Sequence, residues 1–507
     1  MNVIARNTIL LSVAKFFSVA IYSVFGLLLA RYVPTSQNGV YGLMNSLLFF
    51  GSLISSFGIP LVVMRSVARD PTRAGQVYAD GRAAMWAGSV LAWIGIFAYL
   101  AYESWDYGRF DEQKFILAGL IAAIVLSDAL GSLGEGVFQG FERMATPALI
   151  EIAAGLLRAG GALAALIVAP VEYRLYAVWT MFLIGAIFRG VLVSVLLRKR
   201  LLRGIPIPAS SLRRGLALAI EAGYIGLFRM LRMLRNRIDV ILVGTLIAMP
   251  AFLTKDEWDP DVPRGLYAQA VRVVVIFHTL TLAFTTAIFP RIVRQTSDRN
   301  QLGAARESYR TAVDWQAWWS APLAAGLFFY ADTVCGWFGP QYRDGIPELG
   351  LHASTADVLR VLLVAVFLDC VGGPVGAVMM GMKEMEKRMP LIGLAIAGTS
   401  VAMNVILIPR YGLMGAAWAS VCAAVVEFGI KIFLVSRIFG NPAPLLGRIL
   451  PHSALAAGMI GLLLLLGLEQ RAILGGIVGA AAYGLASLAC GLTHPAIRRK
   501  VLGLVRR

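Results

Sequence analysis

Residues 115–138 read FILAGLIAAIVLSDALGSLGEGVF, and residues 356–381 read ADVLRVLLVAVFLDCVGGPVGAVMMG. Each run is long enough to cross a bilayer, which takes about 20 apolar residues at 1.5 Å per residue. Each carries one aspartate near its middle, and from there the two runs match without a gap. The matched pairs are Asp128 with Asp369, Gly131 with Gly372, Val137 with Val378, Gly140 with Gly381 and Met144 with Met385. The sequence therefore predicts a membrane protein with an internal repeat.

The rest of the chain has the same character. Of its 507 residues 58% are hydrophobic and only 15% are charged, and the mean hydropathy is +0.73. A water-soluble protein of this length needs a more charged exterior. We predict an all-α polytopic protein with about fourteen membrane spans. They lie near 8–32, 40–63, 83–102, 115–138, 146–169, 175–197, 217–248, 265–289, 316–338, 356–381, 390–409, 412–434, 449–467 and 472–492.

The repeat predicts how the spans are organised. Pro147 and the three residues after it match a stretch from Pro390, and Gly39-Val-Tyr41 opens span two as Gly265-Leu-Tyr267 opens span eight. Copies six spans apart run in the same direction, which implies two six-helix lobes around a central cavity. We expect an N-lobe over 1–205 (spans one to six), a C-lobe over 206–440 (spans seven to twelve), and 441–507 with two further spans and a basic tail.

The net charge of +17 is concentrated in alternate loops. Because Lys and Arg are enriched on the cytoplasmic side of a membrane, loops such as 198–214 and 290–310 are expected inside. The loops 106–114 and 255–261 are expected outside. Both termini are then cytoplasmic, and the first apolar segment is a retained helix rather than a removed signal peptide. Positive-inside topology also explains the basic composition without nucleic-acid binding.

No chemistry of catalysis is visible. The four cysteines and four histidines lack metal-ligand or disulfide spacing, and no phosphate-binding glycine loop or nucleophile arrangement is found. We expect no enzymatic activity, no metal and no cofactor.

Span seven carries the most unusual charges. Residues 228–239 read FRMLRMLRNRID, within what the sequence predicts to be a single helix over 217–248, about 48 Å long where a membrane core needs roughly 30 Å. At 100° per residue one helix face holds several polar residues. They are Glu221, Arg229, Arg232, Arg235, Asn236 and Asp239. This face is an anion site in one interpretation, because guanidinium groups suit phosphate. In the other, its arginines pair with carboxylates or reach an interface.

Other ionisable residues lie within predicted spans, where each costs several kcal/mol unless it is paired or faces a cavity. Lys15, Arg158 and Arg272 are candidate substrate-binding cations; Arg158 has a structural alternative, since Glu151 and Asp128 are suitable partners. Three carboxylates are candidates for ion coupling or for helix packing. They are Asp128, Asp369 and Glu427, the last with Lys431 one helical turn away.

Four stretches resemble the lipid-linked oligosaccharide flippases of the multidrug/oligosaccharidyl-lipid/polysaccharide (MOP) exporter superfamily. They are Leu28-Leu-Ala-Arg31-Tyr-Val-Pro34 with Gly39-Val-Tyr-Gly42, Asn236-Arg-Ile-Asp239-Val-Ile-Leu-Val-Gly244, Gly265-Leu-Tyr267, and Asn404-Val-Ile-Leu-Ile-Pro409-Arg-Tyr-Gly412-Leu-Met-Gly-Ala-Ala417. They occur in order over nearly the whole chain. The resemblance implies transfer of a polyprenyl-diphosphate-linked oligosaccharide across the bacterial inner membrane, by alternating access.

The resemblance also implies partners: the lipid-linked glycan, membrane lipids, and a glycan polymerase or export machinery. Two features depart from the family pattern, namely the dense arginine run of 229–237 and the inserted loop 255–261. Two alternatives stay open for the substrate. One is the peptidoglycan precursor lipid II, and the other is a small molecule or drug exported in exchange for a cation.

Overall fold

The computed structural model describes residues 24–255, 257–297, 299–380, 382, 388–440 and 443–492. These residues form helices and no β-strand beyond an isolated bridge between Ile346 and Leu351. Eight of the described helical segments are long and apolar enough to cross a membrane, while α9 with its arginines is not among them. The protein is therefore an all-α multi-pass membrane protein, as predicted, although a total of fourteen spans remains a prediction.

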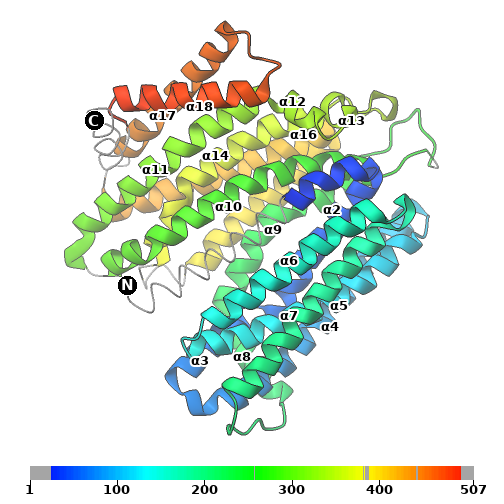
Figure 1. Ribbon diagram of the computed structural model, residues 1–507, viewed down its shortest axis with the longest axis vertical. Coiled ribbons are helices and arrows are strands. Elements are labelled where there is room, and N and C mark those ends of the chain that lie inside the picture. The colour runs from blue at the N-terminus through cyan, green and yellow to red at the C-terminus, as the bar shows by residue number, and fades with distance from the viewer. Residues whose placement is uncertain are drawn as a thin grey trace. The chain divides into compact units, whose positions relative to one another are not determined.

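The chain divides into two compact units. Unit 1 comprises residues up to Gln269 together with Met389–Ala397, and unit 2 comprises Ala270–Arg388 and the residues from Gly398 onward. Figure 1 labels their helices. Unit 1 places α9 beside α2, so this division differs from a boundary at residue 205. The predicted lobes of six spans remain a prediction about the repeat.

Unit 1 begins with a helical stretch over 24–32 and continues with nine described helices. They are α2 (Thr35–Ser56), α3 (Ile59–Arg69), α4 (Ala74–Tyr107), α5 (Glu112–Gly140), α6 (Ala145–Val168), α7 (Arg174–Arg200), α8 (Leu212–Glu221), α9 (Gly223–Leu246) and the start of α10 (Asp261–Ser297). α5 packs on α2, α3, α4 and α7, and α6 packs on α7. Asp111 caps α5 by accepting the N–H of Lys114 at 3.1 Å.

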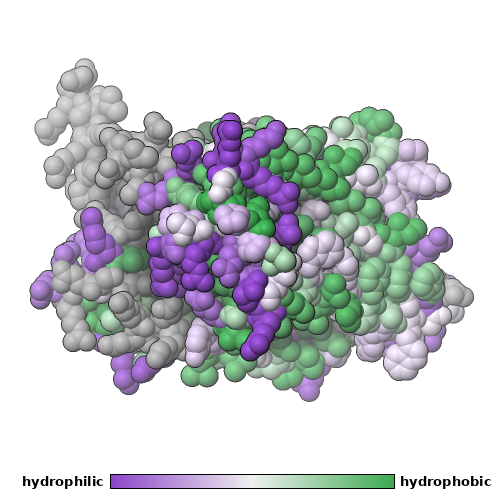
Figure 2. All heavy atoms as spheres, turned by 90° about the horizontal axis from the view of Figure 1, so that it is seen from below, coloured by the Kyte–Doolittle hydropathy of each residue, from purple (hydrophilic) through white to green (hydrophobic). Residues whose placement is uncertain are grey.

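Two cores hold unit 1 together. One is aromatic, with Phe25, Tyr41, Trp179 and Phe182 in edge and tilted contacts at centroid distances from 5.3 to 6.5 Å. The other packs aliphatic residues of α3, α4, α5 and α7. Apolar side chains also remain exposed around the helices, as suits a protein embedded in lipid. Figure 2 shows hydrophilic residues gathered at the end where α3 and α8 lie, with apolar residues on the flanks.

Unit 2 contains the rest of α10 and α11 (Leu302–Phe329), α12 (Ala331–Gly336), α13 (Pro340–Asp344), α14 (Thr355–Met380), α16 (Met389–Phe439) from Gly398 onward, α17 (Ala443–Leu465) and α18 (Ala472–Ala489). α11 packs on α14 and α17, and α17 packs on α18. The long α16 is bent at Gly412, whose φ of 55° ends the first helical stretch and separates the two spans predicted there.

Three predicted spans are broken. The run 316–338 becomes the end of α11 and α12, which are separated by Tyr330. The run 40–63 becomes α2 and α3, because Phe57 and Gly58 adopt left-handed φ angles of 32° and 78°. The single helix expected over 217–248 is wrong: it is two helices, α8 and α9, that meet at Ala222. Glu221 therefore ends α8 and does not lie on the face of α9.

The repeat-equivalent glycines Gly39 and Gly265 meet each other's helix. A Cβ on Gly39 would lie 1.8 Å from the carbonyl oxygen of Asp261, and one on Gly265 would lie 2.0 Å from that of Thr35. The side-chain amide of Asn38 donates to the Gly265 carbonyl at 3.2 Å. Only glycine allows such a close backbone approach, so this contact fixes the start of α10 against the start of α2.

Candidate functional site

The arginines of α9 differ in their surroundings. Arg229 and Arg232 are exposed, and within the described residues neither has a carboxylate partner. Asn236, one turn further on, is exposed as well. We call Arg229, Arg232 and Asn236 the arginine face. Arg235 is half-buried and engaged by other residues, and the Arg237 guanidinium lies 4.5 Å from the ring centre of Phe49.

The arginine face belongs to a well-anchored helix. Gly226 packs against the carbonyl of Phe57, and Gly244 packs against the side chain of Arg264. Phe228 and Leu231 contact Gly393 at the start of α16, within unit 1. Because α9 is held along its length, packing rather than ion pairs fixes the side of the helix from which Arg229 and Arg232 project.

The carboxylates expected near the arginine face are used otherwise. Asp239 is buried and accepts the Tyr267 hydroxyl at 2.6 Å and the Val240 N–H at 2.9 Å. Glu221 is exposed at the end of α8. Neither forms an ion pair with Arg229 or Arg232 in the described part of the chain.

Arg158 belongs to a second group of charges, which we call the carboxylate–arginine cluster. Its members are Asp128 and Glu135 of α5, Glu151 and Arg158 of α6, and Arg189 of α7. Arg158 donates to Asp128 at 2.5 Å. Arg189 lies 3.1 Å from Asp128, 2.8 Å from Glu135 and 2.8 Å from Glu151. Two guanidinium groups thus face three carboxylates, and the cluster joins three helices.

The repeat partner of this cluster lies in unit 2. Glu427 and Lys431 of α16 form an ion pair at 2.7 Å. A Cβ on Gly372 would lie 3.2 Å from Lys431 Nζ, just as one on the matching Gly131 would lie 3.4 Å from a terminal nitrogen of Arg189. Arg189 and Lys431 therefore occupy corresponding places in the two copies. The Asp369 carboxylate is half-buried and has a partner of its own.

Two sequence candidates, Lys15 and Arg272, lie outside the described part of unit 1. Lys15 lies outside the described residues, as does the basic tail after 492. Arg272 lies in unit 2, half-buried and with an interaction partner. No group of His, Cys, Asp or Glu in the described residues has metal-binding geometry.

A buried network of charged side chains, which the sequence did not reveal, lies at the end of α9 opposite to the arginine face. Lys114 of α5 lies 2.6 Å from Asp261 and 3.4 Å from Glu103 of α4. Arg264 of α10 lies 2.6 Å from both of these carboxylates and donates to the Tyr99 hydroxyl at 2.9 Å. These four charges are almost fully buried. The spacing of Asp261 and Arg264, three residues apart, was a signal of their pairing in the sequence. No such signal exists for Glu103 and Lys114, which come from other helices.

Comparison with known proteins gives the family. A family model described as polysaccharide biosynthesis protein matches residues 4–295. The chain belongs to this family. A probable flippase, AglR of Haloferax volcanii, is 23% identical over 332 residues, covering 64% of the chain and 62% of that protein's length.

Solved structures share the fold. The lipid II flippase MurJ in an inward closed conformation matches 95% of the chain and 98% of its own, with a TM-score of 0.69 and 13% identity. An inward-facing multidrug resistance transporter of the MATE family matches 83% of the chain and 95% of its own, with a TM-score of 0.63 and 15% identity. The chain thus has the fold of these flippases and transporters, and the family match confirms the resemblance seen in its sequence.

Proposed function

We propose that the protein moves a polyprenyl-diphosphate-linked oligosaccharide from the cytoplasmic to the outer leaflet by alternating access. The observation that carries this proposal is the arginine face, where Arg229 and Arg232 are exposed without a carboxylate partner among the described residues. A guanidinium within a span costs several kcal/mol unless something compensates its charge. A diphosphate supplies that charge whenever the substrate is bound.

The chemistry of arginine favours a diphosphate over other ligands. Its planar fork donates two parallel N–H bonds to phosphate oxygens and keeps its charge when desolvated. Asn236 adds an amide, and Lys15 and Arg272 are further candidate cations from the sequence. Arg158 is held by Asp128 at 2.5 Å, so its participation requires that pair to open. The polyprenyl tail stays in the bilayer while the glycan crosses in the cavity.

We propose that the protein lies in the bacterial inner membrane with both termini in the cytoplasm, which the basic loops support. The cationic face then meets substrate made on the cytoplasmic side. A glycan polymerase or export machinery on the outer side would use the product.

Ion coupling is part of the proposal. Asp128, Asp369 and Glu427 lie within spans, and the first and last pair with Arg158 and Lys431. We propose that exchange of a cation or proton at these carboxylates biases the two conformations. Asp239 and Glu221 are alternatives, although Asp239 already holds Tyr267 and Val240.

The test is flipping in liposomes by purified wild-type protein and an Arg229→Ala/Arg232→Ala double variant of normal thermal stability. We expect wild type to flip lipid-linked oligosaccharide and the double variant to fail. The same liposomes loaded with lipid II, or with a fluorescent cationic drug and an ion gradient, test the two alternatives. Activity of the double variant equal to wild type would show that the arginine face is not the diphosphate site.

A further inference from the structure

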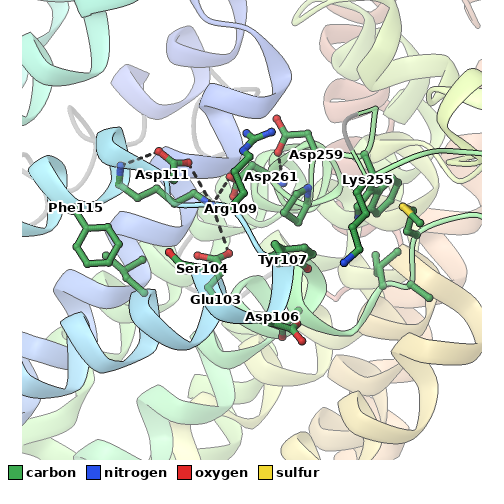
Figure 3. A pocket seen from close by; sticks show the side chains of 18 residues that line it. Glu103, Ser104, Asp106, Tyr107, Arg109, Asp111, Phe115, Lys255, Asp259 and Asp261 are labelled. Carbon is green, nitrogen blue, oxygen red and sulfur yellow. Dashed lines mark hydrogen bonds and ion pairs between the residues drawn. The ribbon is translucent and has the colours of Figure 1, made fainter.

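A cavity of 260 Å³ lies at the end of unit 1 that we expect to face outward (Figure 3). We call it the outer cavity. It is bounded by the end of α4, the 108–111 loop, the start of α5, the end of α9 and residues that follow α9. A second cavity of 240 Å³ shares some of its walls, namely Arg109, Asp111, Asp259 and Asp261. Part of this surface is the inserted loop that departs from the family pattern.

The floor of the outer cavity is the buried network. Glu103, Lys114 and Asp261 line it, and Arg264 supports them from behind. These two cations and two carboxylates neutralise one another at distances from 2.6 to 3.4 Å. The floor is therefore rigid and polar, and its charged groups are already paired with one another.

The walls of the outer cavity carry charged side chains that are not part of the buried network. Asp106, Arg109 and Lys255 line the cavity with exposed side chains and form no ion pair within the described residues. Asp259 accepts the N–H of Asp261 at 2.9 Å, and burial together with the charge of Asp261 raises the pKa of its carboxyl. Hydrogen-bond donors and acceptors therefore surround the outer cavity. Figure 3 labels Asp106 and Lys255 among the side chains that line it.

Apolar surface completes the lining. The rings of Tyr107, Phe115 and Trp258 contribute to it. Trp258 is only 5% exposed, and its indole N–H finds no acceptor among the described residues. A buried indole N–H usually has an acceptor, so this donor is an unsatisfied polar group beside the cavity.

This combination discriminates among ligand classes. Carboxylates on the walls disfavour a second diphosphate, and the charged rim disfavours an apolar drug. A sugar ring fits, because each hydroxyl both donates to a carboxylate and accepts from arginine or lysine, while its C–H faces pack on aromatic rings. We infer that the outer cavity binds a sugar residue of the translocated glycan, an inference that rests on the proposed function.

Helix α9 connects the arginine face with the outer cavity. Arg232 and Thr245, which lines the outer cavity, are thirteen residues apart on α9, about 20 Å along its axis at 1.5 Å per residue. A diphosphate held at Arg232 therefore leaves the outer cavity to a sugar well removed from the lipid. The site selects an oligosaccharide over a lipid that carries one sugar.

The probe is the oligosaccharide pool released by mild acid from the lipid-linked fraction of the source membranes, which lacks both diphosphate and lipid. Isothermal titration calorimetry measures its binding to the full-length protein in detergent. We expect binding by wild type and at least fivefold weaker binding by an Asp106→Asn/Lys255→Gln variant. Glu172→Gln, at an exposed residue in another loop expected outside, is the matched control and should bind like wild type.

The Arg229→Ala/Arg232→Ala variant separates this inference from the proposed function. It should bind the free oligosaccharide as wild type does, because the probe carries no diphosphate. No binding by wild type, or equal binding by the Asp106→Asn/Lys255→Gln variant, would overturn the sugar site even if the arginine face proves essential for flipping. Loss of binding in the α9 variant would place the glycan at the arginine face instead.

Discussion

The arginine face and the carboxylate–arginine cluster lie in the same unit, yet the surroundings of their guanidinium groups differ. Arg158 and Arg189 contact three carboxylates and are largely buried, with side chains 15% and 13% exposed. Arg229 and Arg232 are exposed and, in the described part of the chain, contact no carboxylate. The guanidinium groups of the cluster are paired with carboxylates of the protein, whereas in our proposal the arginine face takes its anion from the substrate. Pairing therefore distinguishes the arginines that join helices from those that we propose bind a ligand.

The largest expected effect is on the stability of the cluster. Arg189→Ala leaves Glu135 and Glu151 without the guanidinium that neutralises them. Removing one partner of a buried ion pair costs about 3–5 kcal/mol. We expect a clear fall in the unfolding temperature of the purified protein, measured by tryptophan fluorescence in detergent.

Arg143→Ala is the control, because Arg143 is exposed at the end of α5 and should not affect unfolding. Arg229→Ala should likewise leave the unfolding temperature unchanged. If Arg189→Ala unfolds at the wild-type temperature, the distinction between the two groups of arginines is wrong.

The second effect is on transport. The Arg229→Ala/Arg232→Ala variant loses two charge-assisted donors, each worth about 1.5–3 kcal/mol. Flipping of lipid-linked oligosaccharide should fall roughly a hundredfold or more, since 1.4 kcal/mol is a factor of ten. The measurement is the initial rate in liposomes at equal amounts of folded protein. A rate within twofold of wild type would mean that the face is only a lipid contact.

The sequence predicts the parts of this fold that local sequence features determine. Apolar runs and loop charges are local, and the predicted spans are mostly helical where their residues are described. The breaks at Phe57 and Ala222 were not predicted, because hydropathy continues unchanged through both. Backbone angles at such points depend on the packing of α3 and α8 against α4, which a single sequence does not reveal.

The sites were predictable only in part. The periodicity of α9 indicated its arginines, and the pairing of Asp128 with Arg158 was one of the alternatives. Arg189 was not singled out, since Asp128, Glu135 and Glu151 lie 38 to 61 residues away on two other helices. The buried network of Glu103 and Arg264 was missed for the same reason. Long-range ion pairs have no periodic signature, so their partners appear only once helices are placed.

A smaller effect tests whether the cluster and its repeat partner also act in coupling. Asp128→Asn and Glu427→Gln keep the shape of each side chain and remove its charge from Arg158 and Lys431. Coupling free energies are typically 1–3 kcal/mol, so we expect transport driven by an imposed pH or sodium gradient to fall about fivefold or more. Flipping without a gradient should change less. Equal loss under both conditions would indicate a purely structural role.

The smallest expected effect is on the flipping rate, when the planar shape of each arginine is removed and its charge is kept. Arg229→Lys/Arg232→Lys keeps both positive charges but replaces each planar fork by a point charge, so bidentate contact with a diphosphate is lost. We expect the flipping rate to fall about threefold, well short of the loss in the alanine variant, since 0.65 kcal/mol already gives a factor of three. Arg189→Lys should show the reverse pattern, a lower unfolding temperature, because a single ammonium cannot reach Asp128, Glu135 and Glu151 at once. If lysine at α9 abolishes flipping as alanine does, the bidentate geometry itself is required. If lysine restores full activity, the face attracts its ligand by charge alone, and diphosphate recognition must come from other residues.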